Sequence, residues 1–506
     1  MSDDTDVVGA TYRFGPRDSR GPLGGLRSGQ VAIAAGALVL GLCSLRALGG
    51  IGGALAGLAS ILLGGLTCAV RIAGRGPDEW APCVAGFLLR RSRQHARRGA
   101  APAPLTTSGP GAPAGGPGST EPRRSPAPPG RAGRRTRLES WPVGLGRGLR
   151  LLDGVEVVQL EISGGRQLGA VLDRRRGTST AVLELRADGL PLLGAADRAR
   201  LVAAWSGLLV ATAMQAGGVE RLSWIERTLP DRREVLRHPP PGAPCGPARS
   251  YEGLLAGETR SLLRHEVLLA CTVASRTRRG EAAGGVTGRI AGELERLSLR
   301  CQAAGITVEH ALDPEQLAAV LSSTFSADGV AAGGGRWPVP LGVQEEWGCL
   351  RTDATWHACY WVAEWPRSDV AGDFLLPLLV GSWARRSVSL VMAPRPATRA
   401  VRAAEHARTE KAADAELRRR HGFALTARLQ REQEAVERRE HELAAGHAAY
   451  RFSGYVSVTA AGRDELTEAC RSVEQAAALS RLELRRLYGS QAEAFCCTLP
   501  TGRGCG

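Results

Sequence analysis

The stretch LGLCSLRALGGIGGALAG, residues 40–57, decides how the chain is organised, because it places one arginine inside a long apolar run. Between Val31 and Val70 the only charged residue is Arg46. A single helix over this run would be about 60 Å long, twice the roughly 30 Å hydrocarbon core of a bilayer. We therefore predict two membrane spans, residues 31–48 and 51–70.

The turn between the two spans is predicted at Arg46, Gly49 and Gly50. The two glycines allow a tight reversal, because they adopt backbone conformations that other residues avoid. The Arg46 side chain can extend to the polar interface, so the turn is where its charge costs least. A cleaved leader is disfavoured, since the chain begins MSDDTD and Leu42 precedes Cys43, where a lipoprotein cleavage site has a small residue.

Small residues recur at four-residue spacing along both predicted spans. Such rows let two helices approach closely in lipid. The predicted packing residues are Ala37 and Gly41 on the first span and Gly53, Gly57, Ser60 and Gly64 on the second. Glycine and alanine are common throughout the chain, which leaves composition as an alternative explanation.

The positive charge of the chain is concentrated next to the apolar run. The chain has 65 basic and 50 acidic residues, and the densest arginine cluster follows the second span. The arginines predicted to set the orientation and contact anionic lipid are Arg71, Arg75, Arg90, Arg91, Arg93, Arg97 and Arg98. Because arginines flank the run on both sides, the positive-inside rule places both termini in the cytoplasm. We do not expect direct binding of nucleic acid, since this basic run has no interleaved aromatic residues.

Composition divides the chain into five segments. Residues 1–30 form a cytoplasmic N-terminal segment, and residues 31–70 form the hairpin. Residues 71–98 are predicted as a basic amphipathic helix next to the membrane. Residues 99–135, rich in alanine, proline and glycine, are predicted as a disordered linker. Residues 136–506 are predicted as one cytoplasmic α+β domain.

Within this last segment, helical and strand patterns alternate, which predicts the α+β fold class. Two strand–helix–strand units, over residues 355–394 and 450–489, are typical of split βαβ arrangements. Residues 397–449 between them predict a long charged helical hairpin, broken near Gly422. Its mixed charges suit a solvated face, and an exposed hairpin could also present a docking surface.

The search for catalytic motifs finds no candidate. A Walker A loop needs a lysine, and the single lysine, Lys411, lies in a helical pattern. HELAAGH, residues 441–447, places its two histidines six residues apart rather than at the spacing of a zinc helix. The chain has 12 cysteines without a CxxC pair, which suits a reduced cytoplasm. We predict no catalytic, cofactor-binding or metal-binding residues, and no enzyme.

Four segments carry a family resemblance: TYRFGPRDSRGPLGGLRSGQV, LSWIERTLP, CYWVAEWPRSDV, and the run from ELAAGHAAYRFSGYVSVTA to LELRRLYGSQAEAFCCTLP. They resemble an actinobacterial family of type IV secretion and conjugative elements. In this resemblance the hairpin is similar to a PrgI-type, VirB-three-like membrane subunit. The remainder is similar to the N-terminal, non-catalytic domain of a VirB-four-like secretion ATPase. The motor domain would begin after Gly506, so the resemblance implies a separate P-loop ATPase as a partner.

The main prediction is a multi-pass, non-catalytic structural subunit of a type IV secretion apparatus, which docks a separate ATPase at the inner membrane face. Other secretion membrane subunits, lipids and further copies of the chain are the remaining partners. One alternative is a type VII secretion membrane component of the EccE kind, which has a similar layout. Another is a membrane-bound enzyme with an unfamiliar site. The docking candidates are Trp361, Trp365, Asp369 and Phe374, although tryptophan in strands more often belongs to the core.

Overall fold

The computed structural model describes residues 14, 28–69, 76–98, 139–144, 152, 154–161, 167–186, 189, 193–214, 218–230, 263–275, 285–327, 329, 340, 342–420 and 427–504. The predicted linker, residues 99–135, lies outside these described residues, as does the predicted break at Gly422. Helices and antiparallel strands alternate along the described part of the chain, which confirms the α+β class.

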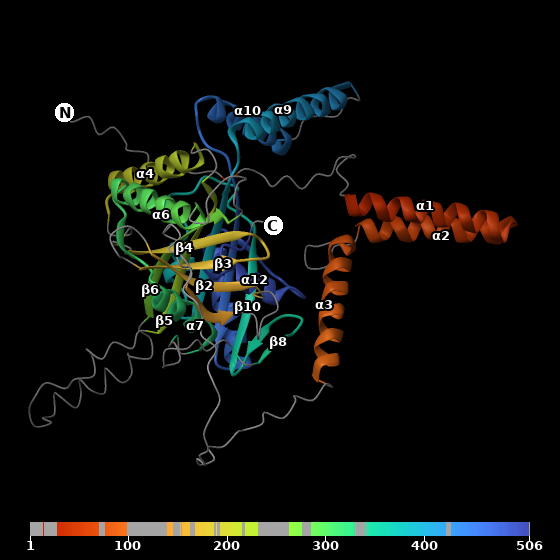
Figure 1. Cartoon of the computed structure of the whole chain (residues 1–506). Helices are drawn as coiled ribbons and strands as arrows, with labels where there is room; N and C mark the ends of the chain where they lie inside the picture. Colours follow the sequence, from red (N-terminus) through yellow and green to blue (C-terminus); the bar gives the residue numbers. More distant parts are fainter. Residues whose placement is uncertain are drawn as a thin grey trace, which may run out of the picture.

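The first two helices form a pair that projects from the rest of the molecule (Figure 1). Helix α1 covers Ser28–Leu48 and helix α2 covers Gly50–Ala69. Helix α3, Pro77–Arg98, leaves the base of this pair and runs along the side of the α+β domain (Figure 1). Its first turn carries Asp78 and Glu79, and acidic side chains there interact favourably with the positive end of the helix dipole.

One sheet organises the α+β domain. Within the described residues it has 13 strands, and its main path runs β1-β2-β3-β4-β6-β5-β11-β12-β10-β9-β8, with β7 beside β4 and β13 beside β10. The strands are β1 (Glu139–Gly144), β2 (Val155–Glu161), β3 (Gln167–Asp173), β4 (Thr178–Arg186), β5 (Val219–Pro230), β6 (Leu263–Ala274), β7 (Thr307–Ala311), β8 (Val343–Glu345), β9 (Leu350–Thr352), β10 (Thr355–Glu364), β11 (Arg386–Pro394), β12 (Tyr450–Ala460) and β13 (Glu483–Arg486).

The first half of the sheet is a split βαβ unit. Its elements follow in the order β4-α4-β5-β6-α6-β7, where α4 is Ala195–Met214 and α6 is Gly285–Ala303. In space the strands lie in the order β7-β4-β6-β5, and every neighbouring pair is antiparallel. This is the ferredoxin-like arrangement, in which each helix connects two strands that are separated by a third.

The second half repeats the same arrangement. Its elements are β10-α8-β11-β12-α11-β13, where α8 is Leu376–Val380 and α11 is Arg463–Leu479. The strands lie in the order β13-β10-β12-β11, again antiparallel. The two predicted strand–helix–strand units are therefore the two halves of this one unit. The first and second units join where β5 pairs with β11.

Two long helices connect β11 to β12 in the second unit. Helix α9 covers Ala397–Arg420 and helix α10 covers Ala427–Ala444. They pack against each other, and Arg408 on α9 forms an ion pair of 3.0 Å with Glu440 on α10. Figure 1 shows this charged pair away from the sheet, as the sequence predicted for residues 397–449.

Helices cover both faces of the sheet. Successive strand residues point to opposite faces, and β10 shows the division. Ala358 and Tyr360 pack with α8 and α11, whereas Cys359 between them packs with two further helices, α7 (Pro314–Phe325) and α12 (Gln491–Cys497). On β11, Leu390 belongs to the cluster with α4 and α6. The face opposite α7 and α12 is thus shared by the helices of both units.

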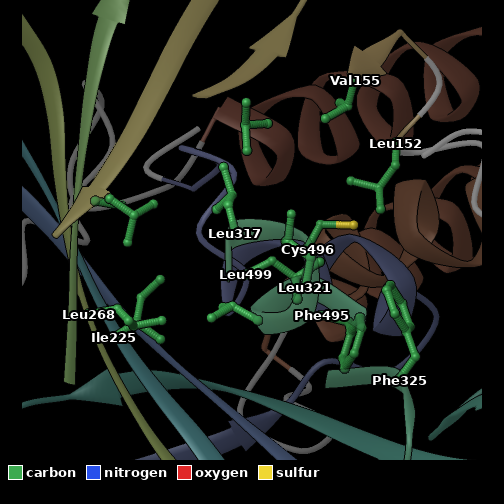
Figure 2. Packing of buried hydrophobic residues seen from close by; sticks show 14 of the residues in the cluster. Leu152, Val155, Ile225, Leu268, Leu317, Leu321, Phe325, Phe495, Cys496 and Leu499 are labelled. Carbon is green, nitrogen blue, oxygen red and sulfur yellow. The ribbon is translucent and has the colours of Figure 1, made fainter. Parts of the chain in front are cut away.

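The core on the α7 and α12 face belongs to both units. Figure 2 shows Leu317 and Leu321 of α7 grouped with Phe495 of α12, near Ile225 and Leu268 from the first unit's strands. The rings of Phe325 and Phe495 are 5.6 Å apart, so the last residue of α7 packs against α12. Each unit therefore supplies side chains to this cluster, so the two units share part of their core.

Candidate functional site

The outer surface of the helix pair is apolar. Leu40, Ile51 and Leu62 expose 65, 81 and 64% of their surface. Gly29–Ala47 and Gly50–Thr67 are long and apolar enough to cross a membrane, judged by length and composition. A contiguous apolar surface of this kind is unfavourable in water and favourable against lipid or another protein.

Small residues form the contact between α1 and α2. The buried ones are Gly41, Gly53, Gly57 and Gly64. A Cβ added to Gly57 would lie 3.0 Å from the carbonyl oxygen of Gly41, and one added to Gly64 would collide with the Cβ of Ala37. Ser60 is half-buried, and its hydroxyl donates to a backbone carbonyl of its own helix at 2.9 Å. The structure thus brings the predicted small residues of both helices together.

The reversal between the helices lies at the predicted glycines. Gly49 and Gly50 have φ values of 56° and 59°, the left-handed region that other residues rarely adopt. Arg46 lies in the last turn of α1 and is exposed. The charge therefore lies at the tip of the pair, away from the end that connects to the domain.

An aromatic contact fastens α3 to the β8–β9 connection and to the segment after β13, next to the second unit. Trp80 stacks on Trp347, with ring centroids 5.6 Å apart, and Phe87 meets the same ring edge-on at 5.2 Å. Tyr488 stacks on the Trp347 ring at 6.3 Å. A Cβ at Gly489 would lie 2.7 Å from that ring, so only glycine fits there. We refer to Glu345, Trp347, Tyr488 and Gly489 as the α3 contact site.

Arg90 completes this contact with an ion pair. Its Nε lies 3.0 Å from Oε2 of Glu345, and its guanidinium also donates to the carbonyl of Gly489. The other oxygen of Glu345 accepts from the backbone N–H of Ala492 at 3.1 Å, so one buried carboxylate links α3 to α12. Arg90 was predicted to contact lipid, and the structure shows its guanidinium paired with Glu345.

Of the other arginines predicted to set the orientation, Arg91 is the one whose side chain the structure describes. Arg91 is exposed on α3. The side chains of Arg93, Arg97 and Arg98, and the whole of Arg71 and Arg75, lie outside the described residues.

The face of α3 turned away from the domain is apolar. Val84, Leu88 and Leu89 are exposed there. The start of α3 touches the start of α1, because a Cβ at Gly29 would lie 2.8 Å from the Cβ of Asp78. One side of α3 therefore packs on the domain, while the other presents apolar side chains near the base of the helix pair.

The four predicted docking residues lie in β10 and in the segment between β10 and α8. Trp361 is half-buried, and its indole N–H donates to the hydroxyl of Ser453 on β12 at 3.0 Å. Trp365 and Phe374 are half-buried, and Trp365 lies 5.4 Å from the ring of Phe452. Asp369 is exposed between β10 and α8. Trp365 and Phe374 therefore belong to an aromatic group, whereas Trp361 is held by a cross-strand hydrogen bond.

The surroundings of the buried His357 are those of a structural residue. His357 bonds Thr352 at 2.7 Å through Nε2 and Thr459 at 3.0 Å through Nδ1. Burial, together with the positive charge of Arg385, lowers the pKa of His357 to about 3. The ring is therefore neutral at physiological pH, and both of its nitrogens already have partners.

The buried cysteines are poor nucleophiles. Burial raises the pKa of the Cys271, Cys496 and Cys497 thiols to about 12, and that of Cys359 well above its ordinary value. A thiol reacts as its thiolate, so these side chains are inert at neutral pH. Among the described residues, no group of three histidine, cysteine or acidic side chains is arranged to hold a metal ion.

Sequence reasoning missed the residues that join α3 to the domain. Trp80, Cys83, Phe87 and Arg90 recur at helical spacing, and this pattern marks one face of α3 as a packed face. Trp347 carried no comparable signal, because its partners are distant in sequence.

Comparison with known families places part of the chain in a secretion-system family model. Residues 264–362 match the family model described as "Putative type VII ESX secretion system translocon, EccE". The matched segment is less than half of the chain, runs from β6 into β10, and includes Glu345 and Trp347 of the α3 contact site. No curated protein matches the chain.

This match corrects the family assignment. The predicted resemblance to type IV secretion and conjugation proteins, with a PrgI-type hairpin and a VirB-four-like domain, is wrong. That prediction relied on four short sequence segments and on their order along the chain, in which an apolar hairpin precedes an α+β region without a motor. Layout does not specify function, because membrane-anchored components of different systems share it. The match supports the type VII alternative of the EccE kind.

Proposed function

We propose that the chain is a membrane-anchored, non-enzymatic component of a type VII secretion translocon. The observation that carries this proposal is the position of the α3 contact site. Glu345 and Trp347 lie within the segment that matches the translocon family, and they hold the helix that follows the apolar pair. The part of the chain similar to a translocon component is thus attached directly to the elements suited to a membrane.

In this proposal α1 and α2 cross the bilayer, and α3 lies between the bilayer surface and the domain. The exposed Val84, Leu88 and Leu89 would enter the interface, while Trp80, Phe87 and Arg90 hold the domain. Both ends of the helix pair lie on the domain side, since the start of α1 touches the start of α3. The flanking arginines favour the cytoplasm for that side, and Arg46 would lie at the opposite surface.

The partners in this proposal are other membrane subunits of the translocon, with a separate ATPase as the source of energy. The apolar outer surface of the helix pair suits packing against other spans as well as lipid. The neutral, fully bonded His357 and the buried thiols support a structural role. Hydrolysis of ATP by the purified chain alone would contradict it.

Co-purification tests the assignment to a secretion system. The tagged full chain is extracted from its native host in a mild detergent, and bound proteins are identified by mass spectrometry against an untagged control. We expect type VII membrane subunits. Recovery of conjugation subunits, or of no membrane protein above the control, would overturn the proposal.

Reporter fusions test the topology. Alkaline phosphatase is active only outside the cytoplasm, so a fusion at Gly49 should be active and fusions after residues 98 and 504 inactive. The reverse pattern would place the domain on the wrong side of the membrane for this proposal.

A further inference from the structure

An aromatic cluster on the second unit is built around a glycine. Trp365 follows β10, Phe374 precedes α8, and Phe452 lies near the start of β12. The Trp365 ring covers Gly454, where a Cβ would lie 2.9 Å from the ring and 2.7 Å from Cγ2 of Val362. The absence of a side chain at Gly454 therefore allows Trp365 to lie against β12 and meet the ring of Phe452 at 5.4 Å.

Phe14 occupies this cluster. Its ring centroid lies 5.2 Å from Trp365, 5.5 Å from Phe374 and 6.2 Å from Phe452, with tilted planes in all three pairs. These distances lie within the range over which aromatic pairs attract one another. The Phe14 ring thus contacts side chains from three separate parts of the second unit, although it precedes α1 in the chain.

We propose that Trp365, Phe374 and Phe452 form a binding site for the chain's own N-terminal segment, with Phe14 as the anchor. The site takes an aromatic side chain, since three rings surround it, and Phe14 fills it here. The domain is then fastened to the helix pair at two points: through α3, which follows α2, and through Phe14, which precedes α1. The two predicted docking residues Trp365 and Phe374 are therefore occupied from within the chain. This proposal does not rest on the type VII assignment or on the identity of other subunits.

Photo-crosslinking tests which segment occupies the site. The full chain is purified in detergent with p-benzoylphenylalanine in place of Phe14, irradiated, digested and mapped by mass spectrometry. We expect crosslinks to peptides that contain Trp365, Phe374 or Phe452, in a species that migrates as a monomer. The same photoreactive residue in place of the exposed Trp383 is the control and should not capture the N-terminal segment. Crosslinks exclusively to other regions would overturn the proposal, and so would products that are exclusively dimeric, which would assign the site to a second copy.

Hydroxyl-radical footprinting gives an independent measurement on the same protein. Phe14→Ala should raise the oxidation of Trp365 and Phe452 by about two-fold or more, because ring surface covered by Phe14 becomes accessible. Phe14→Trp should restore the protection, and Trp383→Ala should leave it unchanged. Equal oxidation of Trp365 and Phe452 in the wild type and in a normally folded Phe14→Ala variant would contradict the proposal.

Discussion

The two split βαβ units share one strand order but differ in what is attached to them. In the first unit, two long helices, α4 and α6, cover the sheet. In the second unit, the helix equivalent to α4 is the five-residue α8, and the long pair α9–α10 extends from the strands β11 and β12. Phe14 contacts the second unit, and α3 contacts the β8–β9 connection and the segment after β13, next to that unit. Helices of both units therefore cover the sheet, and the second half also receives segments from the N-terminal part of the chain.

The two units also differ in their interior, in the polar pair at one cross-strand position. On β4, the hydroxyl of Thr180 lies 2.9 Å from that of Thr272 on β6. At the corresponding position of the second unit, His357 on β10 bonds Thr459 on β12. Both pairs are buried, but only the second contains a group that titrates near neutral pH in water. A repeated backbone therefore tolerates different interior chemistry, provided that the polar atoms are paired.

The largest expected effect tests whether the two units share one core. Phe495→Ala removes a fully buried ring that packs on Phe325 and on His357, and it should lower the free energy of unfolding by about 3–5 kcal/mol. Chemical denaturation of the full chain in detergent measures this change, and hydrogen exchange should show weaker protection in strands of both units. Leu299→Ala, at an exposed position on α6, is the control and should change stability by less than about 0.5 kcal/mol. Loss of protection confined to the second unit would show two separate cores.

The second prediction concerns the pH dependence of the unfolding free energy, to which His357 of the second unit contributes. His357 stays neutral in the folded state down to about pH 3, whereas in the unfolded chain it takes up a proton below about pH 6.5. Its contribution to stability is complete above pH 6.5 and falls as the pH drops toward 3. The slope of about 1.4 kcal/mol per pH unit predicts a loss of about 2 kcal/mol between pH 7 and pH 5. His357→Gln should remove this part of the pH dependence, and an identical pH profile in that variant would contradict the assignment.

A third test concerns the close packing at Gly454. Gly454→Ala forces a Cβ against Trp365 and Val362, so we expect a loss of about 1–3 kcal/mol in unfolding free energy and a shift in tryptophan emission. Gly462→Ala is a control in the same unit, because open space surrounds Gly462 and alanine loses there only the preference of a helix N-cap for glycine. Equal effects of the two substitutions would mean that backbone conformation, rather than contact with Trp365, explains the requirement for glycine.

The smallest expected effect concerns the attachment of α3. Arg90 is partly exposed, so solvent weakens its ion pair with Glu345, and Arg90→Gln should cost about 0.5–1 kcal/mol. Hydrogen exchange along α3 should therefore accelerate by a few-fold. Arg91→Gln, at the exposed neighbouring position, should leave the exchange unchanged. If both variants accelerate it equally, the arginines act on the detergent or lipid surface rather than through Glu345.

The sequence by itself determined the features that depend on local pattern. The apolar run with Arg46, Gly49 and Gly50 predicted a helical hairpin, since span length and turn chemistry follow from neighbouring residues. The alternating patterns predicted the α+β class and the charged helices at 397–449. The family resemblance failed, because four short segments and their order did not identify the family, whereas residues 264–362 match the EccE family model.

Only the tertiary structure decided which distant residues meet. Trp347 joins Trp80, Phe14 joins Phe452, and β5 joins β11 through contacts between residues far apart in the chain. Local periodicity cannot specify such pairs, because it reports which face of an element is apolar and not what covers that face. The same limit explains Arg90: its position in a basic run favoured lipid, and folding placed the buried carboxylate of Glu345 beside it.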